Sequence, residues 1–308
     1  MIKESLIQYF GDSPIDYLSL DPRLEHFENQ DTFLAFSNQS VIGNPIGKNK
    51  IQLLDAFISS YPHHCFYHIS EEIAEYLQKK DYFISFMGYE HSLELQEITI
   101  SWKNFNSLKS GANKCLKRKI SIKEKCLSEL KKKELEYIGK KWLERKETKK
   151  AVGLLIRKLD FISRKGFRYF FAYQEKKLIG YYFFAPIYKD KKLVAYYTDN
   201  CRYIPELGKN LSDLFIYHAV KVFKKEGRER LSLGLSPFAE NYHSNFPQNR
   251  TINTLFKLIY HLNIPKYGYK GIHRYSQKFH SQKAPYFFAS KKRLDILNLF
   301  QTWKKMNT

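Results

Sequence analysis

Basic side chains are the most concentrated chemical groups in this sequence. Between residues 103 and 150, 17 lysines and arginines accompany 6 aspartates and glutamates, a net charge of +11. The whole chain carries +21, so about half of its excess charge lies in this one stretch. Such a density of positive charge attracts polyanions, above all the phosphates of a nucleic acid or anionic lipid headgroups. The alternative is a lysine-rich surface that only keeps the protein in solution.

The cysteines and histidines show no metal-ligand spacing. None of the four cysteines belongs to a CxxC pair or a ligand-spaced cluster, namely Cys65, Cys115, Cys126 and Cys201. Reduced, structural thiols of a cytoplasmic protein are therefore predicted. His63, His64 and His68 flank one strand-like run without carboxylates beside them, and we interpret them as structural. The sequence predicts no metal site and no cofactor.

Length and composition predict packed α/β cores. With 308 residues, 43% apolar and 16% aromatic, the chain is long enough for one large domain or two ordinary ones. Its longest nearly uncharged apolar stretch, residues 178–188, is shorter than the roughly 20 residues of a membrane-spanning helix. The amino terminus has no signal-peptide pattern. We expect a cytoplasmic protein whose contact with a membrane is peripheral, on its inner face.

The elements that must position any site are clearest in the C-terminal half. Three aromatic and β-branched runs separated by charged turns predict an antiparallel meander, at residues 167–174, 178–187 and 193–198. A loop with Arg202, Pro205 and Gly208 follows. A helix over 211–225 and a strand over 230–233 come next.

The first half shows a similar but weaker alternation. It predicts helices at 51–60 and 71–79 and strands at 65–69, 82–87 and 93–100. Two basic helices lie between the halves. The first carries an apolar stripe of Phe105, Leu108, Ala112, Leu116 and Ile120. The second has Leu127, Leu130, Ile138, Trp142 and Leu143 as its buried side. We interpret these two helices as the bridge between related units.

A strand meander that opens through a glycine-containing loop into a helix resembles the acyl-accepting core of the GNAT acyltransferases. In that fold the strands splay, and backbone N–H groups at the helix start hold the phosphates of an acyl donor. The segment from Arg202 to Gly208 lacks the second glycine of the family's phosphate loop. This difference disfavours a CoA donor.

A more extensive resemblance covers residues 33–289. The run Tyr267-Gly-Tyr-Lys-Gly-Ile-His-Arg-Tyr-Ser-Gln-Lys278, followed by Pro285-Tyr286, resembles the closing motif of phosphatidylglycerol lysyltransferases, the bacterial aminoacyl-phosphatidylglycerol synthases. Further segments match in the same order, namely Gly43-Asn-Pro45-Ile-Gly47, Phe66-Tyr67, Met87-Gly88-Tyr89-Glu90, Leu108-Lys109 with Ala112-Asn113, Trp142-Leu143, Asp199-Asn-Cys-Arg202 with Gly208 and Asp213-Leu214, and Leu231-Ser-Leu-Gly234-Leu-Ser-Pro237. Asn44 and Ser276 differ from the aspartate and lysine of the family pattern.

The resemblance implies an α/β fold of two tandem GNAT-like units, each a mostly antiparallel mixed sheet flanked by helices. We place the units at residues 1–122 and 151–308, with a basic linking helix at 123–150 and most of the active site in the second unit. The family transfers an amino acid from aminoacyl-tRNA to a lipid hydroxyl such as that of phosphatidylglycerol. Its best-known members carry a membrane flippase before this domain, so we expect this chain not to move lipid across a bilayer.

The resemblance also implies the site residues. Asp199 and Arg202 would face the reaction centre, the carboxylate to pair with an ammonium or ease a deprotonation, the guanidinium to grip a phosphate. Glu90 would be a second acidic group and Lys278 would hold phosphate or oxyanion charge. Substrate-binding roles fall to Lys109, Asn113, Lys114, Tyr197, Gly208, Asp213 and Arg274.

An aminoacyl ester is already activated, so the enzyme needs neither ATP nor a metal and works mainly by positioning. We therefore expect an aminoacyltransferase that uses aminoacyl-tRNA and a lipid or another small hydroxyl or amine acceptor. Two alternatives stay open. One is an acyl-CoA-dependent GNAT transferase, and the other is a non-catalytic module of the same fold that binds tRNA or a membrane.

Overall fold

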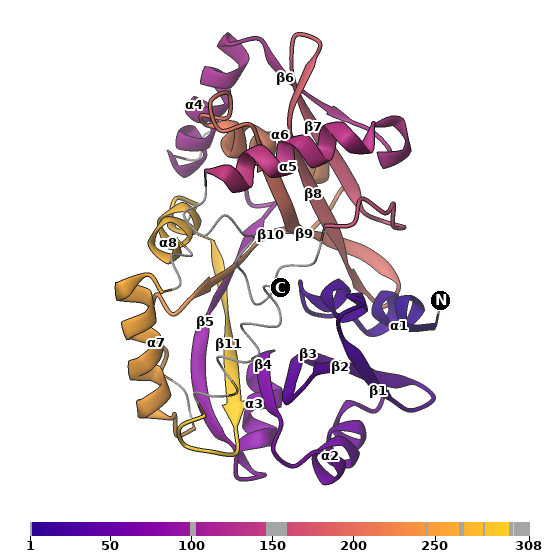
Figure 1. Ribbon diagram of the computed structural model, residues 1–308, viewed down its shortest axis with the longest axis vertical. Coiled ribbons are helices and arrows are strands. Elements are labelled where there is room, and N and C mark those ends of the chain that lie inside the picture. The colour runs from indigo at the N-terminus through magenta and orange to yellow at the C-terminus, as the bar shows by residue number, and fades with distance from the viewer. Residues whose placement is uncertain are drawn as a thin grey trace.

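The computed structural model describes residues 2–98, 103–145, 159–243, 246–264, 268–279, 281–295 and 298. Over these residues the strands form one continuous sheet in the order β1-β2-β3-β4-β11-β5-β10-β9-β8-β7-β6 (Figure 1). None of the helices in the described part of the chain has the length and apolar character needed to span a membrane.

The N-terminal half supplies the first five strands. Its elements are α1 (Ile2–Phe10), η1 (Asp16–Leu20), β1 (Glu25–Glu28), β2 (Thr32–Ser37), β3 (Ser40–Gly47), α2 (Lys50–Ser60), β4 (Cys65–Ile69), α3 (Glu71–Gln78) and β5 (Phe83–Glu94). Helices α2 and α3 bury Phe57 and Ile73 in one apolar cluster with Phe66 of β4. The predicted helices and the strand at 65–69 are confirmed. The predicted strand at 82–87 is confirmed as the first part of β5, which continues to Glu94. The separate strand predicted at 93–100 is wrong for residues 95–98, and residues 99 and 100 lie outside the described residues.

The C-terminal half supplies the remaining six strands. Its elements are α4 (Lys103–Lys117), β6 (Ile120–Glu124), η2 (Leu127–Glu129), α5 (Lys132–Glu144), β7 (Arg168–Gln174), β8 (Lys177–Lys189), β9 (Lys192–Tyr203), α6 (Leu211–Lys225), β10 (Arg230–Pro237), α7 (Arg250–Leu262), α8 (Tyr269–Gln277) and β11 (Gln282–Ser290). The predicted meander and the helix after it are confirmed. Arg202 lies in β9 and not in the predicted loop, and the matched segment Gly43–Gly47 belongs to β3.

Each half contains one short parallel pair of strands that then diverges. Strand β3 pairs with β4 only from Ser40 to Ile42, and β9 pairs with β10 only from Ala195 to Tyr197. Beyond these points the two strands of each pair bond to other neighbours, and each pair opens into a fork. A meander followed by a parallel, forking pair is the expected GNAT arrangement, so the prediction of two tandem GNAT-like units is confirmed.

The two halves exchange their last strands. Strand β11, which ends the C-terminal half, lies between β4 and β5 of the N-terminal half, and β5 in turn lies beside β10. In Figure 1 the yellow β11 runs along the purple β5, although the two come from distant parts of the chain. We call these four strands, β4, β11, β5 and β10, the seam. Because both halves contribute strands to it, the seam joins them through backbone hydrogen bonds.

The two basic helices do not form this join. Helix α4 packs with α6 on one face of the C-terminal sheet, where Leu108 and Phe215 meet Phe170. Helix α5 packs on the opposite face, where Ile138 meets Phe171, the next residue of the same strand. Figure 1 shows α5 in front of β8 and β9 and α6 behind them. The interpretation of both helices as a bridge is therefore wrong, while the unit boundaries at 122 and 150 stay a prediction.

The apolar stripe predicted for α4 is partly wrong. Leu108 and Ala112 are buried, whereas Leu116 is 49% exposed and Cys115 is buried in its place. The stripe follows the contact with α6, because residues at spacings of three and four face the same neighbour. Helix α4 and strand β6 thus pack within the C-terminal half, although the predicted boundary at 122 places α4 in the first unit and divides β6.

Candidate functional site

A row of four buried polar side chains crosses the seam, one from each strand. His68 of β4 stacks on Tyr286 of β11, with ring centroids 3.9 Å apart. The Nε2 atom of His68 lies 3.8 Å from Oε2 of Glu90 on β5. The other carboxylate oxygen of Glu90 accepts a hydrogen bond of 2.8 Å from the hydroxyl of Ser232 on β10. We call these four residues the seam row.

Irregular strand pairing aims these side chains at one another. His68 is the extra residue of a bulge between β4 and β11, and its φ of 58° is unusual for a residue with a side chain. Leu233 is the extra residue of a second bulge, directly after Ser232. Bulges reorient side chains and are frequent beside active sites. Their presence at both ends of the seam row supports a functional assignment for it.

Burial sets the charge states in the seam row. Removal from water raises the pKa of Glu90 to about 7, although Ser232 and Arg230 lower it in part. Burial lowers the pKa of His68 to about 3, so its imidazole is neutral at physiological pH. Within the described residues, Oε2 of Glu90 and both ring nitrogens of His68 have no hydrogen-bond partner. The seam row therefore has unused hydrogen-bonding capacity in a buried place.

The loop between α1 and η1 adds further acidic groups beside the seam row. Ser13 contacts Tyr286, and Asp12 and Asp16 lie close enough to raise the pKa of that phenol further, after burial and Glu90. Asp16 is itself buried, and burial followed by the charge of Asp12 holds its pKa well above the usual value. Asp12 is paired with Lys50 at 2.7 Å, so Glu90 and Asp16 are the buried carboxyl groups around the row.

Two predicted residues lie at the fork between β9 and β10. Tyr197 is the last residue of β9 that pairs with β10, and its partner there is Ser232 of the seam row. Asp199 follows as the extra residue of a bulge in β9, where it is half-buried. Its charge contributes to the raised pKa of Arg164, whose main partner is Asp160. Asp199 therefore lies two residues beyond the point where β9 stops pairing with β10.

Arg202 lies farther along β9 and is buried. Its guanidinium carbon is 3.8 Å from the ring centroid of Trp142 in α5, and its Nη1 donates to the carbonyl of Cys201 at 2.9 Å. Stacking of this kind stabilises by about 0.5–2 kcal/mol and fixes the planar group. The structure therefore brings Arg202 to the α5 face of the sheet.

A third predicted group gathers where α4, α6 and α8 meet. Asp213 lies buried in the first turn of α6, and burial raises its pKa while Lys278, Tyr275 and Lys114 lower it. A carboxylate at this end of a helix is favourable for the helix dipole. It also places negative charge where a GNAT fold holds the donor's phosphates.

The other predicted residues are scattered around this group. Lys109 and Asn113 are exposed on α4, and Arg274 is exposed on α8. Gly208 is buried against the ring of Tyr203, where a Cβ atom would come within 2.0 Å. The structure places Glu90 in the seam row, Tyr197 in the pair with Ser232 of that row, and Asp199 two residues farther along β9. It places Lys278, Lys114 and Asp213 in a separate group.

Sequence reasoning missed most of the seam row. It interpreted His68 as a structural histidine, and it quoted Ser232 and Tyr286 within motifs without giving them a role. The loop residue Asp16 lies in none of the motifs. The signals that would have found them are the bulges and the exchange of strands, neither of which local patterns reveal.

The chain is similar to two solved structures over nearly its whole length. One is L-PGS from Bacillus licheniformis, with a TM-score of 0.80 and 17% identity, covering 98% of this chain and 94% of that one. The other is the C-terminal domain of a putative lysylphosphatidylglycerol synthetase from Agrobacterium fabrum, with a TM-score of 0.75 and 13% identity, covering 97% and 93%. At these identities the similarity supports the shared fold. No curated protein sequence matches the chain.

A family model provides the assignment that fold similarity alone does not. The model described as "Phosphatidylglycerol lysyltransferase, C-terminal" matches residues 21–290, which include all eleven strands that the structure describes, among them the four of the seam. The family transfers aminoacyl groups to lipid, so the expected acyltransferase class is supported. The protein belongs to the family of phosphatidylglycerol lysyltransferase C-terminal domains.

Proposed function

We propose that the chain transfers an amino acid from aminoacyl-tRNA to a hydroxyl group of an anionic phospholipid. The observation that carries this proposal is the seam row with its partly unpaired Glu90 carboxylate, next to a fork that leads to Asp199. An aminoacyl group differs from an acetyl group by its ammonium. A buried carboxylate with one oxygen left to accept hydrogen bonds suits that ammonium.

In the proposed reaction the acceptor hydroxyl oxygen attacks the ester carbonyl carbon. A new ester bond forms, the bond from the carbonyl carbon to the tRNA ribose oxygen breaks, and the acceptor's proton ends on that ribose oxygen. Glu90 holds the ammonium, and Asp199 at the fork carries the proton between the two oxygens. Arg202 keeps α5 in place through Trp142, since its guanidinium is already stacked.

The proposed contact surface for tRNA is the exposed side of α4. Lys109 and Lys114 project from it, and the basic stretch that begins there carries about half of the chain's excess charge. Phosphate contacts release counterions, so the logarithm of the binding constant falls with the logarithm of salt concentration by about 0.7–0.9 per contact. The double variant Lys109→Glu/Lys114→Glu should bind tRNA more weakly and with a shallower salt dependence. The exposed pair Lys176→Glu/Lys177→Glu changes the net charge equally and serves as its control.

The central experiment supplies purified protein with a set of radiolabelled aminoacyl-tRNAs and vesicles that contain phosphatidylglycerol or only phosphatidylcholine. We expect labelled lipid with one or a few aminoacyl-tRNAs, only with the anionic vesicles, and none after RNase treatment. Glu90→Gln should lower kcat/KM by about 10- to 100-fold, the value of a charge-assisted hydrogen bond. Glu94→Gln, on the same strand, is the matched control.

Three outcomes would contradict the proposal. Transfer that survives RNase when acyl-CoA is supplied would establish an acyl-CoA transferase instead. Tight tRNA binding without product from any donor and acceptor pair would favour a binding module. Equal activity of Glu90→Gln and the wild type would exclude Glu90 from ammonium binding.

A further inference from the structure

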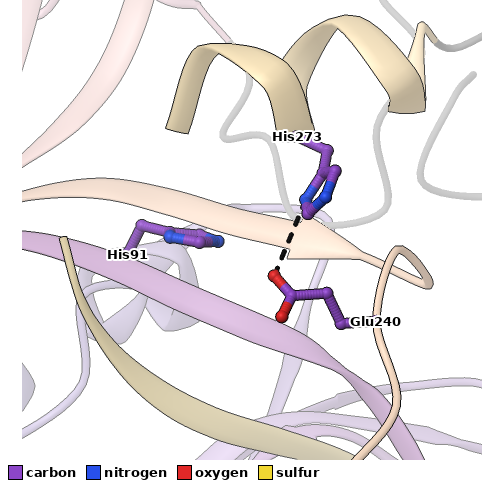
Figure 2. A group of neighbouring side chains, drawn as sticks. All are labelled: His91, Glu240 and His273. Carbon is purple, nitrogen blue, oxygen red and sulfur yellow. Dashed lines mark ion pairs between the residues drawn. The ribbon is translucent and has the colours of Figure 1, made fainter. Parts of the chain in front are cut away.

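A second cluster of side chains lies outside the proposed transfer site. His91 of β5, His273 of α8 and Glu240 from the loop after β10 each offer one ligand atom, and these atoms all lie within 4.8 Å of one another. Figure 2 shows the ring of His91 directed toward the other two side chains. His91 follows Glu90 where β5 pairs regularly with β11, so its side chain lies on the opposite face of the sheet from the seam row.

His91 lies at the buried end of this cluster. Its side chain is fully buried, and its Nδ1 lies 2.7 Å from the hydroxyl of Ser281. Its Nε2 has no hydrogen-bond partner among the described residues. A buried ring nitrogen without a partner is uncommon in folded proteins. When the Ser281 hydroxyl accepts a hydrogen bond from Nδ1–H, the lone pair of Nε2 is directed into the cluster, the arrangement found for metal-ligating histidines.

The other two residues complete a recognised donor set. Nδ1 of His273 lies 3.8 Å from Glu240 and 3.2 Å from the hydroxyl of Ser236. Both side chains are partly exposed, at 13% for His273 and 26% for Glu240. Two histidines and one glutamate are a known zinc ligand set, which leaves a coordination position for water. Partial exposure gives an ion and its water a route of entry.

Lys283 is the group that an ion must displace. Its Nζ lies 2.8 and 2.9 Å from the two carboxylate oxygens of Glu240. Ligand atoms around a tetrahedral zinc ion stand roughly 3.4 Å apart, given bonds of about 2.1 Å. The cluster therefore closes only slightly on binding, through rotation of the Glu240 and His273 side chains away from Lys283 and Ser236.

We propose that His91, Glu240 and His273 form a binding site for a divalent transition-metal ion, with zinc as the best match. The ion would tie α8 and the loop after β10 to the central strand β5. This inference does not rest on the proposed transfer reaction. It goes beyond the sequence analysis, which predicted no metal, because the three ligands lie far apart in the chain.

The test measures metal binding to tag-free protein without any substrate. The protein is stripped with a chelator and titrated with Co²⁺ and Zn²⁺, followed by Co²⁺ visible absorption and calorimetry. We expect one ion per chain, a tetrahedral or five-coordinate Co²⁺ spectrum and a higher melting temperature with Zn²⁺. His273→Asn and Glu240→Gln should each weaken binding by more than about tenfold. Lys283→Met should tighten binding, since it removes the competing cation.

Two controls exclude binding by other surface ligands. His261→Asn removes an exposed histidine of α7, and Cys126→Ser removes the exposed thiol. Both should bind like the wild type. The proposal is overturned if wild-type protein takes up no stoichiometric ion, or if His273→Asn and Glu240→Gln bind as tightly as the two controls. Because His273 and Glu240 are only partly buried, their variants are expected to fold, which circular dichroism would verify.

Discussion

Glu90→Gln tests the electrostatics of the seam row without any substrate. Burial raises the pKa of Glu90 from 4.5 to about 7 in the folded protein. Below pH 4.5 the carboxyl group is protonated in both the folded and the unfolded chain. Between pH 4.5 and 7 the unfolded chain releases this proton while the folded chain keeps it, so Glu90 destabilises the fold increasingly as the pH rises.

The difference between a pKa of 4.5 and one of about 7 corresponds to about 3 kcal/mol of unfolding free energy. Glutamine keeps the shape of the side chain and cannot ionise. The free energy of unfolding of Glu90→Gln relative to wild type should therefore increase by about 3 kcal/mol between pH 4.5 and pH values above 7. Above that range the difference should stay constant.

Urea unfolding at a series of pH values measures this difference. EDTA in every buffer removes any ion from the cluster on the other face of β5. Glu75→Gln, at an exposed position of α3, should show no comparable change with pH. The reasoning is refuted if the Glu90→Gln difference is flat from pH 4.5 to 8, because the carboxylate would then be as well solvated in the folded protein as in the unfolded one.

Two further predictions concern single side chains. The pKa of His68 is lowered from 6.5 to about 3 by burial, so the fold loses stability as the pH falls below 6.5. His68→Gln should reduce this acid sensitivity in urea unfolding from pH 7 to 4, and an unchanged profile would contradict the assignment. Gly111→Ala should destabilise by about 1–3 kcal/mol, since its Cβ would lie 2.3 Å from the Asp213 carboxylate. Gly139→Ala, whose nearest contact is 3.4 Å, should be tolerated, and equal melting temperatures for both would refute the packing argument.

Local patterns predicted much of the fold. The meander at β7–β9, helix α6 and the alternation of α2, β4 and α3 follow from periodicity and turn residues, which act within a few positions of the chain. The order of short motifs predicted the family and the tandem units. It also singled out Glu90 and Tyr197, which do lie at the seam and the fork.

The tertiary structure decided what surrounds those residues. The exchange of β5 and β11 brings His68, Tyr286 and Ser232 to Glu90 from three other strands, and bulges set their directions. The same exchange makes the seam the join between the halves, in place of the basic helices. Pairing of distant strands depends on long-range contacts, which leave no mark in the local sequence.

The sequence by itself determined which charged and polar side chains are present and how they are spaced along the chain. It has an excess of positive charge near α4, acidic residues in the motifs, and no local metal-ligand spacing. Only the tertiary structure decided which groups lose water. Burial at the seam raises the pKa of Glu90, and the meeting of β5, α8 and the loop after β10 brings His91, His273 and Glu240 together. Desolvation depends on what packs around a group, and that is a property of the whole fold.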